Sequence, residues 1–260
     1  MTSVLVITSC SKDAKEKQTQ VDISTETLTK IFNHGFGTSN VQKIEEGYLV
    51  EGDIVLTEDF LNSTPGGNLL RIASVEQYRT TNLVSISGGQ RNITVALDSK
   101  LKAKAGYPQA LTELVNRYNA QSLLLKFSVV SSRANITFVN GSGNYLASAG
   151  FPSGGNPYGT VKVNSNSIGT GTSTTFINFL ASILAHEAGH CIGFRHTDYM
   201  DRSYSCGGAY ANEGASTVGA ILIPGTPSGP DANSWMLACT SYGLNRPFNT
   251  NDKTALNYLY

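Results

Sequence analysis

Three of the four histidines lie within eleven residues, in the run His186-Glu-Ala-Gly-His-Cys-Ile-Gly-Phe-Arg-His196. On a helix, His186 and His190 are one turn apart on the same face, so both imidazoles reach one metal ion. Glu187 follows the first histidine and reaches a water molecule bound to that ion. Gly193 suits the left-handed residue that ends a helix, which lets the chain turn so that His196 becomes a third ligand. Three protein ligands and an open fourth position are typical of catalytic Zn²⁺ sites.

The elements around this run are predicted from hydrophobic spacing. Residues 173–190 begin with Ser and Thr and carry apolar residues at helical spacing, which predicts the helix that holds the first two histidines. Residues 107–118 have Pro in the first turn and apolar residues 3, 4 and 7 apart, as an amphipathic helix does. Further strands are expected at residues 92–97, 123–130, 135–139 and 159–163, with a loop over residues 140–157.

The amino-terminal part shows its own pattern. A capped helix is expected over residues 24–32, followed by a strand over residues 48–56 that a Gly-Asp pair interrupts, and by a small helix from Thr57. Residues 12–20 are polar and charged without apolar periodicity, which indicates a flexible tether.

Composition excludes several function classes. The formal net charge is +0 and no basic run occurs, so the chain lacks the positive patch with which proteins grip nucleic acid. No apolar stretch approaches the roughly 18 to 20 residues that cross a bilayer. We expect one globular domain, or one domain with an extension, acting as a monomer.

The long histidine motif resembles that of the metzincin clan of zinc endopeptidases. This resemblance implies a methionine in a tight turn beneath the metal, and Met236 lies at a suitable distance after His196. It also implies that Glu187 takes a proton from the attacking water and later gives it to the leaving amine. Astacin-like members carry a tyrosine two residues after the methionine, where this chain has Ala238; Tyr242 is six residues on.

Most of residues 90–260 resemble the bacterial dual-action HEIGH metallopeptidases. The resemblance is carried by HEAGHCIGFRHTDY, which begins at His186, and by the segments 203–208, 212–215, 223–228 and 251–260. The resemblance implies an α+β, metzincin-like zincin fold. Its parts are a twisted, mixed five-stranded sheet, a backing helix, the active-site helix, and a smaller carboxy-terminal subdomain ending in a helix. It also implies one catalytic Zn²⁺ and a protein or peptide substrate, and it leaves structural Ca²⁺ open.

A second resemblance concerns latency. Val50-Glu-Gly-Asp-Ile54 is similar to the astacin pro-segment motif Phe-x-Gly-Asp, whose aspartate takes the open position on zinc. This resemblance makes Asp53 a candidate inhibitory zinc ligand, and the alternative is a plain Gly-Asp turn between strands. Residues 14–85 are then a pro-segment and residues 86–260 the catalytic domain.

Residues 1–13 resemble the end of a bacterial lipoprotein signal, with Cys10 as the candidate lipidation site. The apolar core is short and no basic residues precede it, so a polar tail with an incidental cysteine, or a cysteine switch at Cys10, are alternatives. The expected location is extracytoplasmic, as a secreted protein or an outer-membrane lipoprotein of a bacterium. A disulfide between Cys206 and Cys239 suits that compartment, with Cys191 either packed on the helix or an alternative partner.

The sequence leaves open one other function and one other set of zinc ligands. One is a lipid-anchored binding or adhesion protein on an inactive protease scaffold, against which the intact Glu187 and Met236 argue. The other is a zinc site of two histidines and a distant glutamate such as Glu213, in which His196 would not be a ligand.

Overall fold

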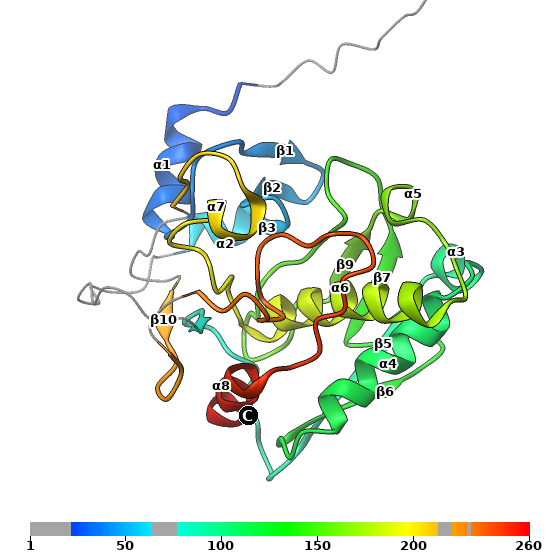
Figure 1. Ribbon diagram of the computed structural model, residues 1–260. Coiled ribbons are helices and arrows are strands. Elements are labelled where there is room, and N and C mark those ends of the chain that lie inside the picture. Colours follow the sequence, from blue (N-terminus) through cyan, green and yellow to red (C-terminus); the bar gives the residue numbers. More distant parts are fainter. Residues whose placement is uncertain (1–21, 64–76, 213–219, 228–229) are drawn as a thin grey trace, which may run out of the picture.

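A mixed five-stranded sheet is the scaffold of the carboxy-terminal part in this computed structural model, which describes residues 22–63, 77–212, 220–227 and 230–260 (Figure 1). Its strand order is β6-β5-β7-β9-β8, and only the edge strand β8 runs antiparallel to its neighbour. The strands are β5 (Arg91–Leu97), β6 (Leu125–Val129), β7 (Ile136–Asn140), β8 (Ala147–Ser148) and β9 (Thr160–Val163).

Two long helices lie side by side against this sheet, α4 (Tyr107–Asn119) and α6 (Thr174–Ile192), with the short α3 (Ser99–Lys102) and α5 (Ser165–Ile168) nearby (Figure 1). Helix α6 begins where Ser173 accepts a hydrogen bond from the backbone N–H of Phe176. From Phe179 onward every residue of α6 is buried, because the sheet, α4 and the carboxy-terminal segment surround it. A helix that is covered on all sides can hold charged and metal-binding groups away from water.

The amino-terminal residues form a separate small unit. A three-stranded antiparallel sheet, β1 (Gln42–Ile44), β2 (Gly47–Val50) and β3 (Ile54–Thr57), packs with α1 (Thr25–Asn33) and α2 (Glu58–Asn62). Its apolar core is distinct from the main core and includes one residue of the carboxy-terminal part, Phe151, whose ring stacks on Phe36. The unit therefore rests on the carboxy-terminal part through an apolar contact.

The carboxy-terminal subdomain is mostly irregular. It contains α7 (Ser203–Cys206), β10 (Ile221–Leu222), which pairs with β4 (Tyr78–Arg79), and the last helix α8 (Thr250–Leu259). Asn249 and Asp252 form a reciprocal capping box at the start of α8. No helix among the described residues is long and apolar enough to span a membrane.

The predicted fold class is confirmed: the protein is α+β, with a five-stranded mixed sheet, a backing helix and the long histidine-bearing helix. The expected loop over residues 140–157 is corrected in one place, because Ala147 and Ser148 form the edge strand β8. Two residues are too few for the alternation by which a strand is recognised in a sequence. Residues 1–13, with the proposed lipoprotein signal, lie outside the described residues.

Candidate metal centre

The three predicted histidines converge on one point. His186 and His190 lie one turn apart near the end of α6, and Gly193 (φ 112°) ends the helix in the left-handed conformation. A β-carbon at Gly193 would lie 2.7 Å from Leu83 Cδ2, so the close packing there also requires glycine. The turn brings His196 back, so that His190 Nε2 lies 3.1 Å from His186 Nε2 and 3.2 Å from His196 Nε2.

Two backbone carbonyls fix the tautomers of the helical histidines. His186 Nδ1 lies 2.9 Å from the carbonyl oxygen of Trp235, and His190 Nδ1 lies 2.8 Å from that of Phe194. An Nδ1–H at such a distance donates a hydrogen bond to the carbonyl oxygen, which leaves Nε2 of the neutral ring with a bare lone pair. Two lone pairs then face each other at 3.1 Å, an arrangement that only a cation between them makes favourable. The donor set thus fits a metal ion.

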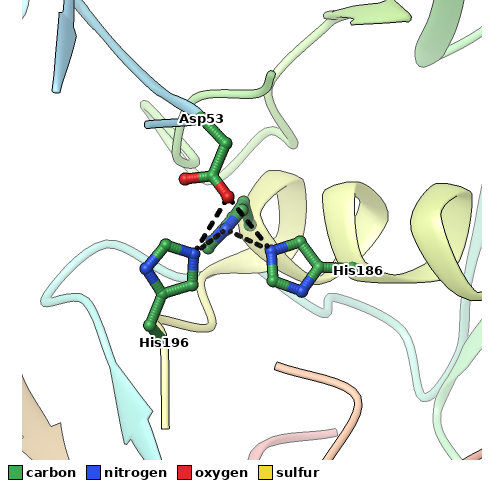
Figure 2. Close-up of side chains that lie close together, drawn as sticks. Asp53, His186 and His196 are labelled. Carbon is green, nitrogen blue, oxygen red and sulfur yellow. Dashed lines mark hydrogen bonds and ion pairs between the residues drawn. The ribbon is translucent and has the colours of Figure 1, made fainter. Parts of the chain in front are cut away.

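Asp53 supplies the fourth group from the turn between β2 and β3. Its Oδ2 lies 3.2 Å from His196 Nε2 and 3.5 Å from His186 Nε2, and Figure 2 shows this carboxylate oxygen facing both rings. All four ligand atoms lie within 4.8 Å of one another. A tetrahedral zinc site with bonds of about 2.0 Å separates neighbouring ligand atoms by about 3.3 Å, which matches the distances found here.

Burial and charge set the protonation of this cluster. Burial and the neighbouring histidines lower the pKa of His190 well below 6.5, so it stays neutral, the form that binds metals. Burial opposes ionisation of Asp53, but the charge of His196 and the hydrogen bonds of His186 and His196 outweigh it and bring the pKa of Asp53 well below its usual range. The cluster therefore combines a neutral imidazole with a carboxylate, both of which are forms that bind Zn²⁺.

Glu187 lies beside the cluster and faces a cavity of about 230 Å³. Its side chain is buried, and its Oε2 has no hydrogen-bond partner among the described residues. Burial, together with the nearby charge of Asp53, raises the pKa of Glu187 well above 4.5. A buried carboxyl group with an unused oxygen at a cavity wall has the chemistry of a proton acceptor and donor.

Met236 lies directly under the histidine-bearing turn of α6. A β-carbon at Gly189 would lie only 2.5 Å from Met236 Sδ, so glycine at this position allows the sulfur to pack against the helix. The carbonyl of Met236 also accepts a hydrogen bond of 2.9 Å from the backbone N–H of Thr197, next to the third histidine. Met236 therefore packs against the histidine-bearing turn, and its role as a Met-turn stays a prediction.

Cys206 and Cys239 form the predicted disulfide, which links α7 to the segment after Met236. Cys191 is buried as a free thiol. Tyr242 is 73% exposed and packs against Phe179, away from the histidines.

Two residues singled out in the sequence, Cys10 and Glu213, lie outside the described residues. The arrangement of the histidines still bears on the choice between the two zinc sites. His196 faces the other two histidines directly, which favours the site of three histidines over the site of two histidines and a distant glutamate.

Sequence reasoning missed a buried ion pair next to the centre. Arg195 precedes the third histidine, and its Nη2 lies 2.8 and 2.7 Å from the two carboxylate oxygens of Glu51. Both side chains are almost completely buried. The signal that could have found this pair was present, because an arginine inside the histidine motif and a glutamate beside Asp53 are both charges that need a buried partner.

A buried cluster of three histidines and a carboxylate, with a glutamate at the wall of a cavity, defines a metal-dependent hydrolase of the metallopeptidase class. The family model described as dual-action HEIGH metallo-peptidase matches residues 48–260, and the chain belongs to this family. No curated protein matches the sequence. One similar solved structure is that of myroilysin, with a TM-score of 0.41 and 18% identity over 69% of this chain and 96% of that chain.

Proposed function

We propose that the protein is a metzincin-type zinc endopeptidase made as a latent precursor. His186, His190 and His196 are the zinc ligands, Glu187 is the general base, and Asp53 is the inhibitory fourth ligand. The observation that carries this proposal is the near-tetrahedral spacing of the four ligand atoms beside a buried glutamate at a cavity.

Each residue has a separate task in peptide hydrolysis. Bound Zn²⁺ would polarise the scissile carbonyl and make water acidic near neutral pH. Glu187 accepts a proton from the attacking water and passes it to the leaving amine. The carbonyls of Trp235 and Phe194 hold the imidazole rings in the metal-binding tautomer. Astacin-like enzymes have a tyrosine two residues after the methionine, but this chain has Ala238 there. No side-chain hydroxyl from that position therefore takes part in the reaction.

Latency is supported by the way the amino-terminal unit holds Asp53. The carbonyl of Asp53 accepts a hydrogen bond of 2.9 Å from the N–H of Ala149, and the N–H of Val55 donates one of 2.7 Å to the carbonyl of Ala149. These bonds place β3 along the sheet edge next to β8. An extended substrate would use the same backbone groups, so the unit would have to leave before a substrate binds.

Two ion pairs add to this docking. The buried pair of Glu51 and Arg195 lies beside the histidines, and Glu46 pairs with Lys162 of β9 at 2.5 Å. Both acids belong to the amino-terminal unit and both bases to the carboxy-terminal part. Charge complementarity therefore favours the closed, latent arrangement.

The contacts suggest an earlier end for the pro-segment than residue 85. Gln77 donates a hydrogen bond of 2.7 Å to Asp252 of α8, and Val84 lies in the main core with its N–H bonded to the hydroxyl of Tyr260. These residues fit a catalytic domain, so we place the end of the pro-segment before Gln77. The separate core of residues 31–61 marks the removable unit.

The compartment follows from the disulfide. A bond between Cys206 and Cys239 is typical of extracytoplasmic proteins. We further propose secretion or attachment to the outer membrane through a lipid on Cys10, with the protein as a monomer. Labelling of expressing cells with a radioactive fatty acid tests the anchor, and a Cys10→Ser variant that is labelled as strongly as the wild type would exclude it.

Zinc content and casein hydrolysis, before and after limited trypsin treatment, test the proposed function. We expect one equivalent of zinc, activity only after nicking, and no activity in Glu187→Gln under either condition. Asp53→Ala should cleave casein without nicking. Zinc binding without activity in any form would refute the peptidase and favour a binding protein on the same scaffold. Unchanged latency in Asp53→Ala would refute the role of Asp53 alone.

A further inference from the structure

The cavity beside the metal centre extends away from it, between α6 and the segment that follows Met236, which crosses α6 in Figure 1. At one end it is lined by His186 and Glu187. At the other end it is lined by Ser182 and Arg246, where the backbone N–H of Arg246 donates a hydrogen bond of 2.9 Å to Ser182 Oγ. A side chain next to the scissile bond of a substrate would enter this space.

Arg246 brings a positive charge to that end without an acidic partner. Its Nη1 donates a hydrogen bond of 2.7 Å to the carbonyl of Cys239, while its Nε is buried with no hydrogen-bond partner among the described residues. No carboxylate in the described part of the chain forms an ion pair with it. Burial lowers the pKa of Arg246, and the more distant charges of Asp198 and Asp252 act in the opposite direction.

The two acids whose charges reach Arg246 have other partners. Asp198 accepts hydrogen bonds from the N–H of Ala238 at 2.9 Å and from Ser205 Oγ. Asp252 accepts from Gln77 and from the backbone around α8. Both act on Arg246 only over a distance. The guanidinium belongs to a residue that lines the cavity, and its donor capacity exceeds the one bond to the carbonyl of Cys239.

The acidic residues that line the cavity are Asp53 and Glu187, both at the metal end. Asp53 belongs to the amino-terminal unit and leaves with it. At the other end the described lining residues carry no carboxylate, so the guanidinium of Arg246 is the group there that a carboxylate of a substrate would contact.

We propose that Arg246 is a specificity-determining residue that selects substrates with an acidic side chain, Glu or Asp, next to the scissile bond. The inference rests on the proposed peptidase function. A carboxylate entering the cavity would form a charge-assisted hydrogen bond with the guanidinium, which forms no ion pair within the described part of the chain.

The test uses the trypsin-activated protein. Cleavage sites in casein are mapped by mass spectrometry, and one cleaved sequence is synthesised with Glu, Gln or Lys in turn at each position flanking the scissile bond. At one of these positions we expect kcat/KM for Glu to exceed that for Gln by roughly tenfold or more. Arg246→Gln should bring this ratio close to one, Arg246→Lys should keep part of it, and Arg246→Glu should favour Lys over Glu.

Arg91→Gln is the matched control, because Arg91 is also partly buried and donates to backbone carbonyls but lies outside the cavity. It should keep the wild-type ratio. Zinc content and thermal melting of each variant separate misfolding from a change in selectivity. An acidic preference that persists in Arg246→Gln, or equal cleavage of Glu and Gln peptides by the wild type, overturns the inference. Absence of any cleavage by zinc-loaded, activated enzyme instead refutes the proposed function.

Discussion

The ion pair between Glu51 and Arg195 leads to a quantitative prediction about latency. The side chains are 2% and 0% exposed, and the guanidinium also donates a hydrogen bond of 3.0 Å to the carbonyl of Gly35. Glu51→Gln keeps the shape but removes the negative charge, so the buried guanidinium of Arg195 loses the carboxylate that it contacts through both oxygens. Breaking a buried pair from one side costs about 3–5 kcal/mol.

This cost acts on the docking of the amino-terminal unit. Glu51, Gly35 and Phe36, whose ring lies 4.6 Å from the guanidinium carbon, all belong to that unit. When the unit moves away, Arg195 regains contact with water and the penalty disappears. A cost of about 3 kcal/mol therefore raises the equilibrium constant for opening by roughly 150-fold.

Hydrogen exchange measures this opening directly. The amides of Val55 and Ala149 bond across the contact between the two parts, so their protection reports whether the unit is docked. In a Glu187→Gln background, which prevents self-digestion, we expect Glu51→Gln to reduce the protection of both amides by roughly 100-fold. With Glu187 intact, the same change should raise casein hydrolysis by the unprocessed protein.

The matched control is the ion pair between Lys43 and Glu58. Its N–O distance, 2.6 Å, is close to the 2.7 Å of the buried pair, but its side chains are 39% and 55% exposed. Glu58→Gln should cost no more than about 1 kcal/mol and change protection at most about fivefold. If Glu51→Gln loses no more protection than Glu58→Gln, the buried pair does not hold the unit in place and the reasoning is wrong.

Three further predictions follow from the site and the two cores. His190→Ala should lose zinc as well as activity, measured by metal analysis after dialysis; retention of a full equivalent would exclude His190 as a ligand. The double variant Cys206→Ser/Cys239→Ser should unfold at lower urea concentration, with a loss of about 3–4 kcal/mol for a loop of this length, and reduction of the wild type should give the same shift. Burial lowers the pKa of His34, so the unfolded chain binds the proton more readily and stability falls as pH decreases below about 6.5. His34→Gln should weaken this pH dependence in urea titrations between pH 5 and 7, and equal slopes would contradict the argument.

The cluster of three histidines was predictable because these residues are close in sequence. The spacing of His186 and His190 follows from one helical turn, and the position of His196 follows from a glycine that ends the helix. The same holds for α4 and α6, whose apolar spacing is regular. In each case a local pattern was sufficient, because the geometry is fixed within one or two consecutive elements.

The remaining features depend on contacts between distant segments. The carbonyls of Trp235 and Phe194 have no side-chain signature, and the edge strand β8 is too short for a pattern. Arg246 and Glu187 line the same cavity although they are far apart in the sequence. Such sites are created by how the segment after Met236 packs on α6, and a single sequence does not specify this packing.

One turn of the amino-terminal unit combines a local sequence pattern with contacts to distant segments. Glu51, Gly52 and Asp53 are consecutive, and they place an acid on Arg195, a glycine against Arg202 and a second acid on the histidine cluster. A side chain at Gly52 would begin 3.0 Å from the Arg202 guanidinium, and φ there is 91°, so glycine suits both the space and the backbone. The Gly-Asp pair thus lies in a turn between strands, and its Asp53 also faces the histidine cluster. The two interpretations of this motif do not exclude each other, because the sharp turn is what allows the carboxylate to reach the histidines.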